Sequence, residues 1–582
     1  MPLHEAFRLG RRALEGTDGV EVVGDVGSSN GWLWFAIDVT IDAESGFIPR
    51  RSRWYVRAEA DYPIGRVRIY PSNSGGVVAT FPHMERNDPT THPWRAGHPC
   101  LDRPGRWLGG RELADQPSSA EERIRWHVAR LREWLVAAAT DALVGPSDPF
   151  ELPKFPTTDD LAFGFDEDPE RFGCWQPHLG QSGQVMLKYP HKKLLIACAF
   201  SLGEAELLPS RWGGRVEATE ASEIGAWIAF KEVPVMAPWY VPGTWGELRQ
   251  VAQRQKMDLD GHLQRVYRDI HARGVAKESH LLLGFPIPKT WGGEPARMHW
   301  QRIALPAPIS VSPRKFHVRK GAAKTKGAWS LERYSLFRDE KVIQWRDSTC
   351  WSEDFLASRG ALSPQLRSSK VALLGCGALG SPLAQCLVRE GVNNILLCDG
   401  EDFEVPNLRR HVLTASSAEY EKSLALRVEL ADASLFAKVA YTQNFPVGLG
   451  TEEERFRDSD TVIDCTGNDD VAFRLAAFAW DGCERWFFSG SIGVDARRLF
   501  LFAHRGTGFP AESFLEAVRP YVVEERARLR EHDPALMMVA GCWNPVFPAR
   551  WDRILSLAGR MVDAIDATVS GVKAPGFDVI EL

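Results

Sequence analysis

The chain has 582 residues, which at about 150 residues per domain indicates about four folding units. Hydrophobic residues make up 44% and charged residues 25%, which excludes disordered and collagen-like chains. Seventy Lys and Arg against 76 Asp and Glu give a net charge of −6. This balance is not typical of a nucleic-acid-binding protein, and we expect no direct contact with nucleic acid.

The apolar pattern and the cysteines indicate a cytoplasmic protein. Apolar runs such as 193–200 are far shorter than the ~18 residues that a membrane helix needs, so no membrane association is expected. Charged residues occupy the first dozen positions or so, where a signal peptide would be apolar. Ten scattered cysteines without a Cys-x-x-Cys pair indicate reduced thiols rather than a zinc knuckle.

The first part of the chain predicts a helix, a four-strand meander, a long ordered loop and a second helix. Alternating and β-branched runs separated by turn residues indicate the strands, and a 3.6-residue period indicates the helices. The predicted helices are 4–16 and 121–143, the strands are 20–26, 31–41, 52–60 and 65–70, and the loop is 80–102. A Pro-rich stretch at 145–156 then predicts a boundary.

The middle of the chain predicts a second α/β unit without a glycine motif or an obvious reactive cluster. One long helix is expected near 244–273, and a basic stretch at 312–326 is interpreted as a solvated linker. The predicted strands are 185–188, 194–200, 226–230 and 281–285.

The pattern changes after residue 369 to short buried strands that alternate with helices. A strand at 371–374, a helix at 381–389 and a strand at 394–398 form a βαβ unit, and a later strand follows at 461–465. Strand, helix and strand with short connections predict a parallel sheet covered by helices.

A glycine motif follows the first of these strands and begins the helix. Gly375, Gly377 and Gly380 permit a tight turn, so that backbone N–H groups and the helix N-terminus can approach phosphate oxygens. Asp399 stands at the end of the next strand, where it can bind ribose hydroxyls. These features suit a nicotinamide-dependent oxidoreductase as well as an ATP enzyme.

Polar and basic residues that follow Asp399 in the sequence distinguish the oxidoreductase from the ATP enzyme. Asn407, Arg409 and Arg410 follow Asp399, and Lys422 lies 15 positions after Asn407. A nicotinamide cofactor carries only a pyrophosphate, and the glycine turn is enough to bind it. Additional fixed cations therefore favour a triphosphate lying across the strand ends, with charge building on its phosphates during reaction.

Together these motifs resemble the adenylation domain of the ThiF/MoeB and ubiquitin-activating enzymes. The resemblance covers about residues 355–505. It implies that ATP, with Mg²⁺, adenylates the C-terminal carboxylate of a small carrier protein and that pyrophosphate is released.

The resemblance also implies roles for individual residues. Asp399 and Glu401 would bind ribose, and the phosphates would be held by Asn407, Arg410 and Lys422. Arg410 and Lys422 would be the catalytic cations of the adenylation step.

Two positions depart from the family pattern. His411 stands where members often have Gln, and Gly467 stands where an acid usually helps to hold Mg²⁺. The metal site is therefore expected to involve Asp464 or Asp469, with Asp470 as a further alternative.

Two of the cysteines are candidates for acyl transfer. Cys542 lies between two predicted helices, 524–531 and 550–568, in a loop with Gly before it and Pro three positions after it. Activating enzymes carry their acceptor thiol on such a segment, which makes Cys542 a candidate acceptor. Four cysteines within the predicted sheet are expected to be structural: Cys376, Cys386, Cys398 and Cys465.

Cys100 is the second candidate. The helix and meander lead through Tyr-Pro and His-Pro segments to Cys-Leu-Asp, and over residues 1–145 this order resembles ubiquitin-conjugating enzymes. That family usually has His-Pro-Asn, whose amide stabilises the oxyanion when lysine attacks. Here the tripeptide ends in Trp94, so His92 or His98 is the candidate for that role.

The combined prediction is an α/β multidomain protein: an N-terminal ubiquitin-conjugating-like α+β domain (1–148), an inactive adenylation-like region (157–345), and a Rossmann-like parallel-sheet adenylation domain (355–582). Cys542 would capture the adenylated carrier and pass it to Cys100, from which a lysine amine takes it. This order resembles the fusion proteins of bacterial type II CBASS anti-phage operons.

The resemblance implies a carrier with a free C-terminus, either a cGAS-like nucleotidyltransferase or a ubiquitin-like protein of a related bacterial operon. It also implies target-protein lysines as acceptors and a homodimer supported by the middle region. Three alternatives stay open from the residues: a sulfur-carrier adenylyltransferase without conjugation, an oxidoreductase, and a scaffold without activity.

Overall fold

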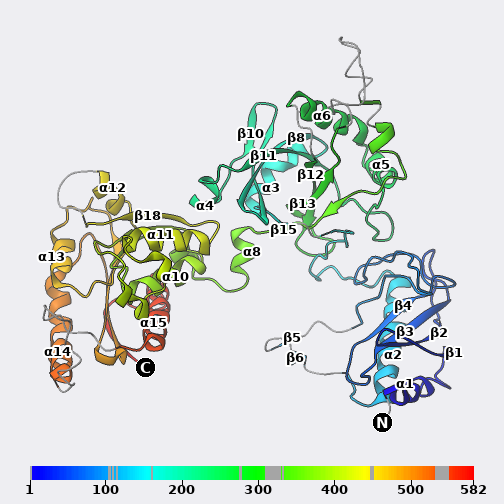
Figure 1. Cartoon of the computed structure of the whole chain (residues 1–582), viewed down its shortest axis with the longest axis horizontal. Helices are drawn as coiled ribbons and strands as arrows, with labels where there is room; N and C mark the ends of the chain where they lie inside the picture. The colour runs from blue at the N-terminus through cyan, green and yellow to red at the C-terminus, as the bar shows by residue number, and fades with distance from the viewer. Residues whose placement is uncertain are drawn as a thin grey trace. The chain divides into compact units, whose positions relative to one another are not determined.

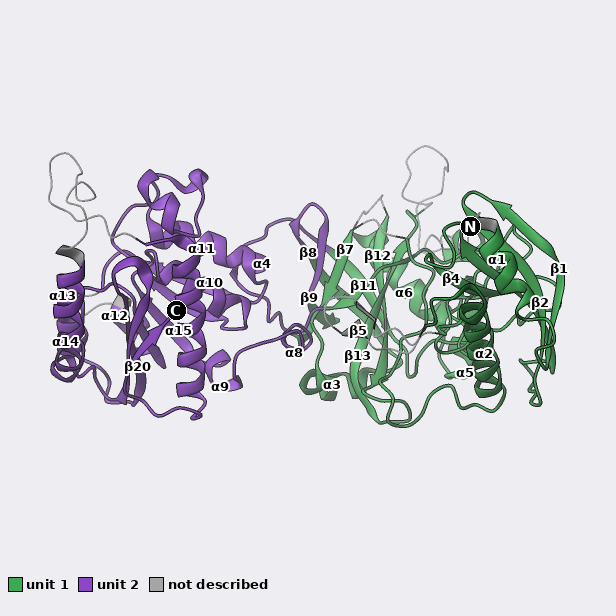
Figure 2. Ribbon diagram, turned by 90° about the horizontal axis from the view of Figure 1, so that it is seen from below, with its two compact units in different colours: residues 1–187, 199–208, 224–350 green, residues 188–198, 209–223, 351–582 purple. Residues whose placement is uncertain are grey.

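A computed structural model describes residues 3–101, 106–107, 111–112, 116–158, 161–273, 278–308, 329–330, 333–445, 451–530 and 549–582. The chain divides into two compact units (Figure 2). The first contains residues 1–187, 199–208 and 224–350, and the second contains 188–198, 209–223 and 351–582. Within the described ranges, the helices are too short or too polar to cross a membrane.

The first unit begins with a four-stranded antiparallel sheet in the order β1-β2-β3-β4, with a helix on each side of it in the sequence (Figure 1). The elements are α1 (Leu3–Arg12), β1 (Val20–Ser29), β2 (Trp32–Thr40), β3 (Arg51–Glu59), β4 (Val67–Pro71) and α2 (Ala120–Ala139). The predicted meander and its two helices are thus confirmed, although α2 ends four residues earlier than the periodicity suggested.

Helix α2 forms because its apolar residues recur at helical spacing and its first turn is capped. Ile124, Val128, Leu131 and Leu135 are each at most 1% exposed and belong to the core that includes β2 and β3. Each such side chain contributes about 1.5–3 kcal/mol by leaving water. The Ser119 side chain accepts a hydrogen bond from the Glu122 N–H at 3.2 Å, which satisfies one open donor at the helix start.

The segment between β4 and Cys100 is irregular but ordered, as predicted. Isolated bridges join Ser72 to Trp94 and Met84 to Pro99. The buried Asn87 side chain donates to backbone carbonyls of the same loop at 2.8 and 3.0 Å. Side chains and short bridges therefore satisfy backbone groups that a regular sheet would otherwise pair.

A nine-stranded sheet forms the middle of the chain, in the order β14-β13-β12-β11-β8-β9-β7-β15 with β10 beside β9. It mixes parallel and antiparallel pairs: β11 and β12 are parallel, whereas β12 and β13 are antiparallel. Its strands are β7 (Ala162–Phe165), β8 (Ser182–His191), β9 (Leu194–Leu202), β10 (Ala205–Leu208), β11 (Ser222–Ala229), β12 (Ser279–Pro288), β13 (Pro295–Leu305), β14 (Trp345–Arg346) and β15 (Thr349–Cys350).

The single long helix predicted near 244–273 is wrong, because the chain forms α5 (Trp245–Arg254) and α6 (Leu259–Ala272). Lys256 between them adopts a left-handed φ of 55°, which a continuous helix does not allow. The side chain of Asp258 then accepts a hydrogen bond from the Gly261 N–H at 3.0 Å and starts a new helix. The apolar residues keep a helical spacing through this region, but the cap at Asp258 divides it into two helices.

The second unit contains a seven-stranded sheet in the order β18-β17-β16-β19-β20-β21-β22. The strands from β18 to β20 are parallel, and β21 and β22 add an antiparallel edge. The elements that position the site are β16 (Lys370–Leu374), α10 (Gly380–Arg389), β17 (Asn394–Cys398), α11 (Lys422–Ala433), β18 (Lys438–Thr442), β19 (Thr461–Asp464), α13 (Asp469–Ala477), β20 (Arg485–Ile492), β21 (Arg498–Gly506), α14 (Ala511–Arg530), α15 (Trp551–Val569) and β22 (Phe577–Glu581).

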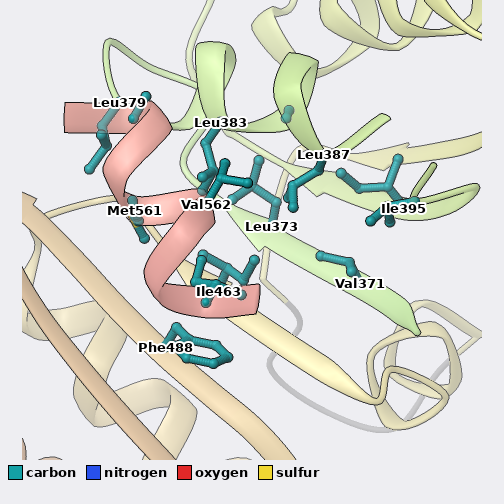
Figure 3. Packing of buried hydrophobic residues seen from close by; sticks show 14 of the residues in the cluster. Val371, Leu373, Leu379, Leu383, Leu387, Ile395, Ile463, Phe488, Met561 and Val562 are labelled. Atoms are coloured by element: carbon teal, nitrogen blue, oxygen red, sulfur yellow. The ribbon is translucent and has the colours of Figure 1, made fainter. Parts of the chain in front are cut away.

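Helix α10 and helix α15 belong to the core of this second sheet. Figure 3 shows Leu379 and Leu383 beside Met561 and Val562 of α15, with Leu373 of β16 close by. All of these side chains are at most 5% exposed. The predicted parallel sheet is therefore confirmed, with its first strand and helix fixed by a continuous apolar core.

Candidate functional site

A cavity of about 700 Å³ lies at the carboxyl ends of β16, β17 and β19. Strand order places it where open α/β sheets bind ligands. The structure brings to it most of the residues selected from the sequence: Gly375, Gly377, Asp399, Glu401, Asn407, Arg410 and Lys422.

The glycine turn has the geometry that its sequence requires. Gly375 has a φ of 84°, in the left-handed region that favours glycine, and its N–H donates to the Cys398 carbonyl at 2.8 Å. Gly380 does not line the cavity. A Cβ there would lie 1.8 Å from the Gly375 carbonyl oxygen, so glycine is needed to let α10 begin against the turn.

Asp399 is held at the end of β17 by backbone donors. The N–H groups of Cys376 and Glu401 donate to its two carboxylate oxygens at 2.7 and 2.9 Å. Burial raises the pKa of Asp399 above its ordinary value, while these bonds and Lys422 act in the opposite direction. The carboxyl group is thus fixed beside the glycine turn, where it can accept hydrogen bonds from ribose hydroxyls.

The cations of the cavity come from three different elements. Lys422 begins α11, its side chain is 6% exposed, and its Nζ donates to Glu401 at 2.5 Å. Arg410 lines the cavity, whereas its exposed neighbour Arg409 does not. Arg474 of α13 also lines it, and was missed from the sequence. The sequence feature that could have identified Arg474 is its position shortly after the carboxyl end of β19.

His411 supports the glycine turn. Its Nε2 donates to the Cys376 carbonyl at 2.6 Å, and its Nδ1 accepts from the Leu413 N–H at 3.1 Å. Burial, with the nearby charge of Lys422, lowers the pKa of His411 to about 4. The residue that replaces the family's usual Gln is therefore a neutral structural group at the wall of the cavity.

The two magnesium candidates differ in what their side chains already contact. Asp464 is 2% exposed, and its carboxylate accepts from the Thr466 N–H, the Thr466 hydroxyl and the Ser489 hydroxyl at 2.7–2.9 Å. Asp469 is exposed at the start of α13. Among the described residues, no three His, Cys, Asp or Glu side chains gather as a metal site. Within those residues the protein side chains alone form no metal cage, and Asp464 or Asp469 would hold Mg²⁺ together with phosphate oxygens of the nucleotide.

The four cysteines that we expect to be structural lie in or beside this sheet, in its glycine turn and in its first helix. Cys376 and Cys398 are buried, and Cys386 and Cys465 are partly buried. Burial raises the pKa values of the Cys376, Cys386 and Cys465 thiols above their ordinary values. Protonated thiols packed in a core are poor nucleophiles. Cys542 lies outside the described residues.

A second cavity, of about 800 Å³, surrounds the exposed Cys100 in the first unit. The backbone N–H of Cys100 donates to the His83 carbonyl at 2.7 Å, which fixes the chain at the cysteine. His83, His98, Arg123, Glu151 and Lys154 also line this cavity. His83 and Glu151 lie 17 and 51 positions from Cys100 and were not among the residues selected from the sequence.

The tripeptide that replaces His-Pro-Asn has a packing role. Trp94 is 4% exposed and lies between Trp34 and Tyr55 with ring centroids 5.5 and 5.4 Å away. His92 stacks on Trp94 at 4.9 Å and is absent from the lining of the Cys100 cavity, whereas His98 lines it. Burial lowers the pKa of His98 below its ordinary value.

Comparison with known proteins agrees with this geometry over nearly the whole chain. Residues 356–531 match the ThiF family, and residues 141–351 match the Cap2 central linker domain. The ATP-dependent ubiquitin transferase-like protein Cap2 of Enterobacter hormaechei subsp. hoffmannii (strain UCI 50) is 31% identical over 561 residues, covering 94% of this chain and 90% of the relative. The chain belongs to the Cap2 family of ATP-dependent ubiquitin transferase-like proteins.

Shorter matches distinguish the shared domain from the whole chain. Cap2 of Vibrio cholerae serotype O1 is 36% identical over 22% of each chain. The sulfur carrier protein ThiS adenylyltransferase of Escherichia coli (strain K12) is 31% identical over 21% of this chain and 50% of that protein. The enzyme is therefore an ATP-dependent ubiquitin transferase-like protein with a ThiF adenylation domain, which decides against the oxidoreductase and scaffold alternatives. An adenylation-like fold for the middle region stays a prediction.

Proposed function

We propose that this enzyme joins the C-terminal carboxylate of a carrier protein to a lysine of a target protein in bacterial anti-phage defence. One observation carries the proposal: a nucleotide-sized cavity on a ThiF sheet and an exposed cysteine in its own cavity occur on one chain. The first suits activation of a carboxylate, and the second suits transfer of the activated acyl group.

The first step is adenylation. The carrier's carboxylate attacks the α-phosphorus of ATP, a new P–O bond forms, and the bond to the departing pyrophosphate breaks. Gly375 and Gly377 bring backbone close to the phosphates, and Asp399 accepts from the ribose. Arg410 and Lys422 stabilise the negative charge that builds on the phosphates. In this assignment the Lys422–Glu401 pair separates when Glu401 turns to the ribose.

Two thiol steps follow. The Cys542 thiolate attacks the acyl-adenylate carbonyl and displaces AMP, and the Cys100 thiolate then displaces Cys542 by transthiolation. A lysine amine finally attacks the Cys100 thioester and forms an amide. Because both thiols are on one chain, the second transfer gains from a high effective concentration.

The carrier that we favour is a cGAS-like nucleotidyltransferase. The order of domains, with the conjugating-like domain first and the ThiF domain last, supports this choice because it matches the type II CBASS fusion proteins. A ubiquitin-like carrier is the alternative, and the test below compares both. We also expect a homodimer, which light scattering of the purified protein tests directly.

The experiment is incubation with ATP, Mg²⁺ and each purified carrier, followed by electrophoresis without reducing agent. We expect a carrier-dependent thioester that thiols cleave. Cys100→Ala should block transfer to lysine, and Cys542→Ala should block both thioesters. The matched control is Cys174→Ala, which removes another exposed cysteine from the unit that contains Cys100.

A sulfur-carrier adenylyltransferase is the second candidate, favoured by the match to the ThiS enzyme. It would exchange pyrophosphate normally in the Cys100→Ala variant and form no amide product. A wild-type protein that gives no thiol-sensitive band with either carrier would contradict the conjugation relay.

A further inference from the structure

Residues 149–156, here called the strap, follow α2 and run along the central sheet. Pro149 bridges to Thr290, and the N–H of Phe150 donates to the Lys289 carbonyl at 3.2 Å. The apolar side chains of the strap, Phe150, Leu152 and Phe155, pack on the core formed by α5, α6, β11 and β12. One side of the strap is therefore anchored in the first unit.

The charged side chains of the strap line the Cys100 cavity instead. A carboxylate oxygen of Glu151 accepts a hydrogen bond from the His83 backbone N–H at 3.1 Å and lies 2.8 Å from His83 Nδ1. Lys154 lies 3.7 Å from a carboxylate oxygen of Glu85. A segment that follows the conjugating-like domain in sequence thus completes the wall of its cysteine cavity.

His83 lies opposite Cys100 in a short antiparallel pairing. Met84 and Pro99 form the bridge, Glu85 N–H donates to the His98 carbonyl at 3.0 Å, and Cys100 N–H donates to the His83 carbonyl at 2.7 Å. Both side chains line the same cavity, and the His83 side chain is 41% exposed. An incoming amine can therefore approach both groups.

The contact with Glu151 sets the tautomer of His83. A carboxylate oxygen is negatively charged and can only accept hydrogen bonds, so at 2.8 Å it favours the proton on Nδ1 and leaves Nε2 as the basic nitrogen. A carboxylate that holds an imidazole in this way orients it and stabilises the imidazolium that forms on proton uptake. The pair has the arrangement of a general base with its orienting group.

We propose that His83, oriented by Glu151 of the strap, accepts the proton of the attacking lysine amine when the acyl group leaves Cys100. This inference rests on the proposed role of Cys100. The neutral amine attacks the thioester carbonyl carbon, and the C–N bond forms. The C–S bond breaks with its electron pair on the Cys100 sulfur, and the proton lost by nitrogen passes to His83 Nε2. Trp94, buried where the family usually has Asn, is absent from the lining of the Cys100 cavity.

Single-turnover discharge separates this step from thioester formation. Cys100 is charged with carrier, ATP is removed, free L-lysine is added, and loss of the thioester is followed without reducing agent. We expect His83→Ala to charge normally and to discharge about 10²-fold more slowly, as expected for loss of a general base. The maximal rate should fall while the half-saturating lysine concentration changes little, and added imidazole should restore part of the rate.

Glu151→Gln provides a second variant that leaves the backbone at the left-handed residue 83 untouched. It should discharge about tenfold more slowly, and it decides the outcome if His83→Ala does not fold. His191→Ala, at an exposed histidine elsewhere, should discharge at the wild-type rate. The proposal would be overturned if His83→Ala or Glu151→Gln discharged at the wild-type rate. It would also be overturned if imidazole did not restore part of the discharge rate of His83→Ala. Failure of the wild-type protein to charge Cys100 would instead contradict the proposed function.

Discussion

The imidazole of His411 donates from Nε2 to the backbone carbonyl of Cys376 over 2.6 Å, and so joins the segment after β17 to the glycine turn after β16. Its other nitrogen accepts from the Leu413 N–H. Because both nitrogens are engaged inside the protein and burial lowers the pKa of His411 to about 4, the ring is neutral near neutral pH. The glycine turn at the nucleotide cavity is therefore held by a side chain.

His411→Ala should weaken ATP binding, because the Cys376 carbonyl loses its donor and the turn loosens. An unsatisfied buried acceptor costs about 1–3 kcal/mol, which corresponds to roughly a tenfold or larger rise in the ATP concentration for half-maximal pyrophosphate exchange. His411→Gln keeps an N–H donor and should retain more of the affinity. Equal ATP dependence in the wild type and in His411→Ala would contradict the supporting role.

Lys422→Ala should reduce carrier-dependent pyrophosphate exchange by about 10²-fold or more, because a buried cation that stabilises developing phosphate charge is removed. The control is Lys370→Ala, at an exposed lysine that begins β16 and lies at the opposite end of the strand from the cavity. Exchange and thioester formation are measured on the same preparations. A normal thioester yield in Lys422→Ala would remove this residue from the nucleotide site.

The two magnesium candidates predict different responses to Mg²⁺. Asp464→Asn places an amide among three donors, so we expect a loss of about 1–3 kcal/mol in stability with little change in the Mg²⁺ concentration required for exchange. Asp469→Asn should raise the required Mg²⁺ concentration without destabilising the fold. Titration of exchange with Mg²⁺, alongside urea unfolding, tests both. The opposite pattern would assign the metal to Asp464.

Glu167, in the connection that follows β7, predicts that the free energy of unfolding depends on pH. Trp175 and Trp300 each donate an indole N–H to one of its oxygens at 2.9 Å, and burial raises its pKa from 4.5 to about 8. The folded state therefore holds one more proton than the unfolded state between about pH 4.5 and about pH 8. Through that window stability falls as pH rises, by about 1.4 kcal/mol per pH unit.

Glu167→Gln cannot ionise, and its carbonyl oxygen can still accept both indole N–H groups. We expect the variant to gain urea resistance over the wild type on going from about pH 5 to about pH 8, because the ionisation penalty is absent. Glu170→Gln, at an exposed acid on α3 (Pro169–Trp175), should follow the wild type. Parallel pH profiles for the wild type and Glu167→Gln would contradict the raised pKa.

The nucleotide cavity could be predicted in large part because its residues follow local rules. The glycine turn and Asp399 stand at the ends of successive strands, and parallel strands bring their carboxyl ends to one edge. Lys422 follows at the start of α11. Arg474 could not be selected in the same way. It comes from a helix whose face toward the cavity depends on packing, and many arginines of this chain occupy similar positions in sequence.

The sequence by itself determined the antiparallel meander and the parallel sheet, because alternation and helical period are local properties of the chain; the two candidate thiols stay predictions. Tertiary structure decided the partners: Glu151 meets His83 across 68 positions, and Asp464 turns inward to Thr466 and Ser489. Such contacts depend on the path of the backbone between the residues. The hydrogen bonds and the burial of a side chain determine its chemistry, and both are set only when the chain has folded.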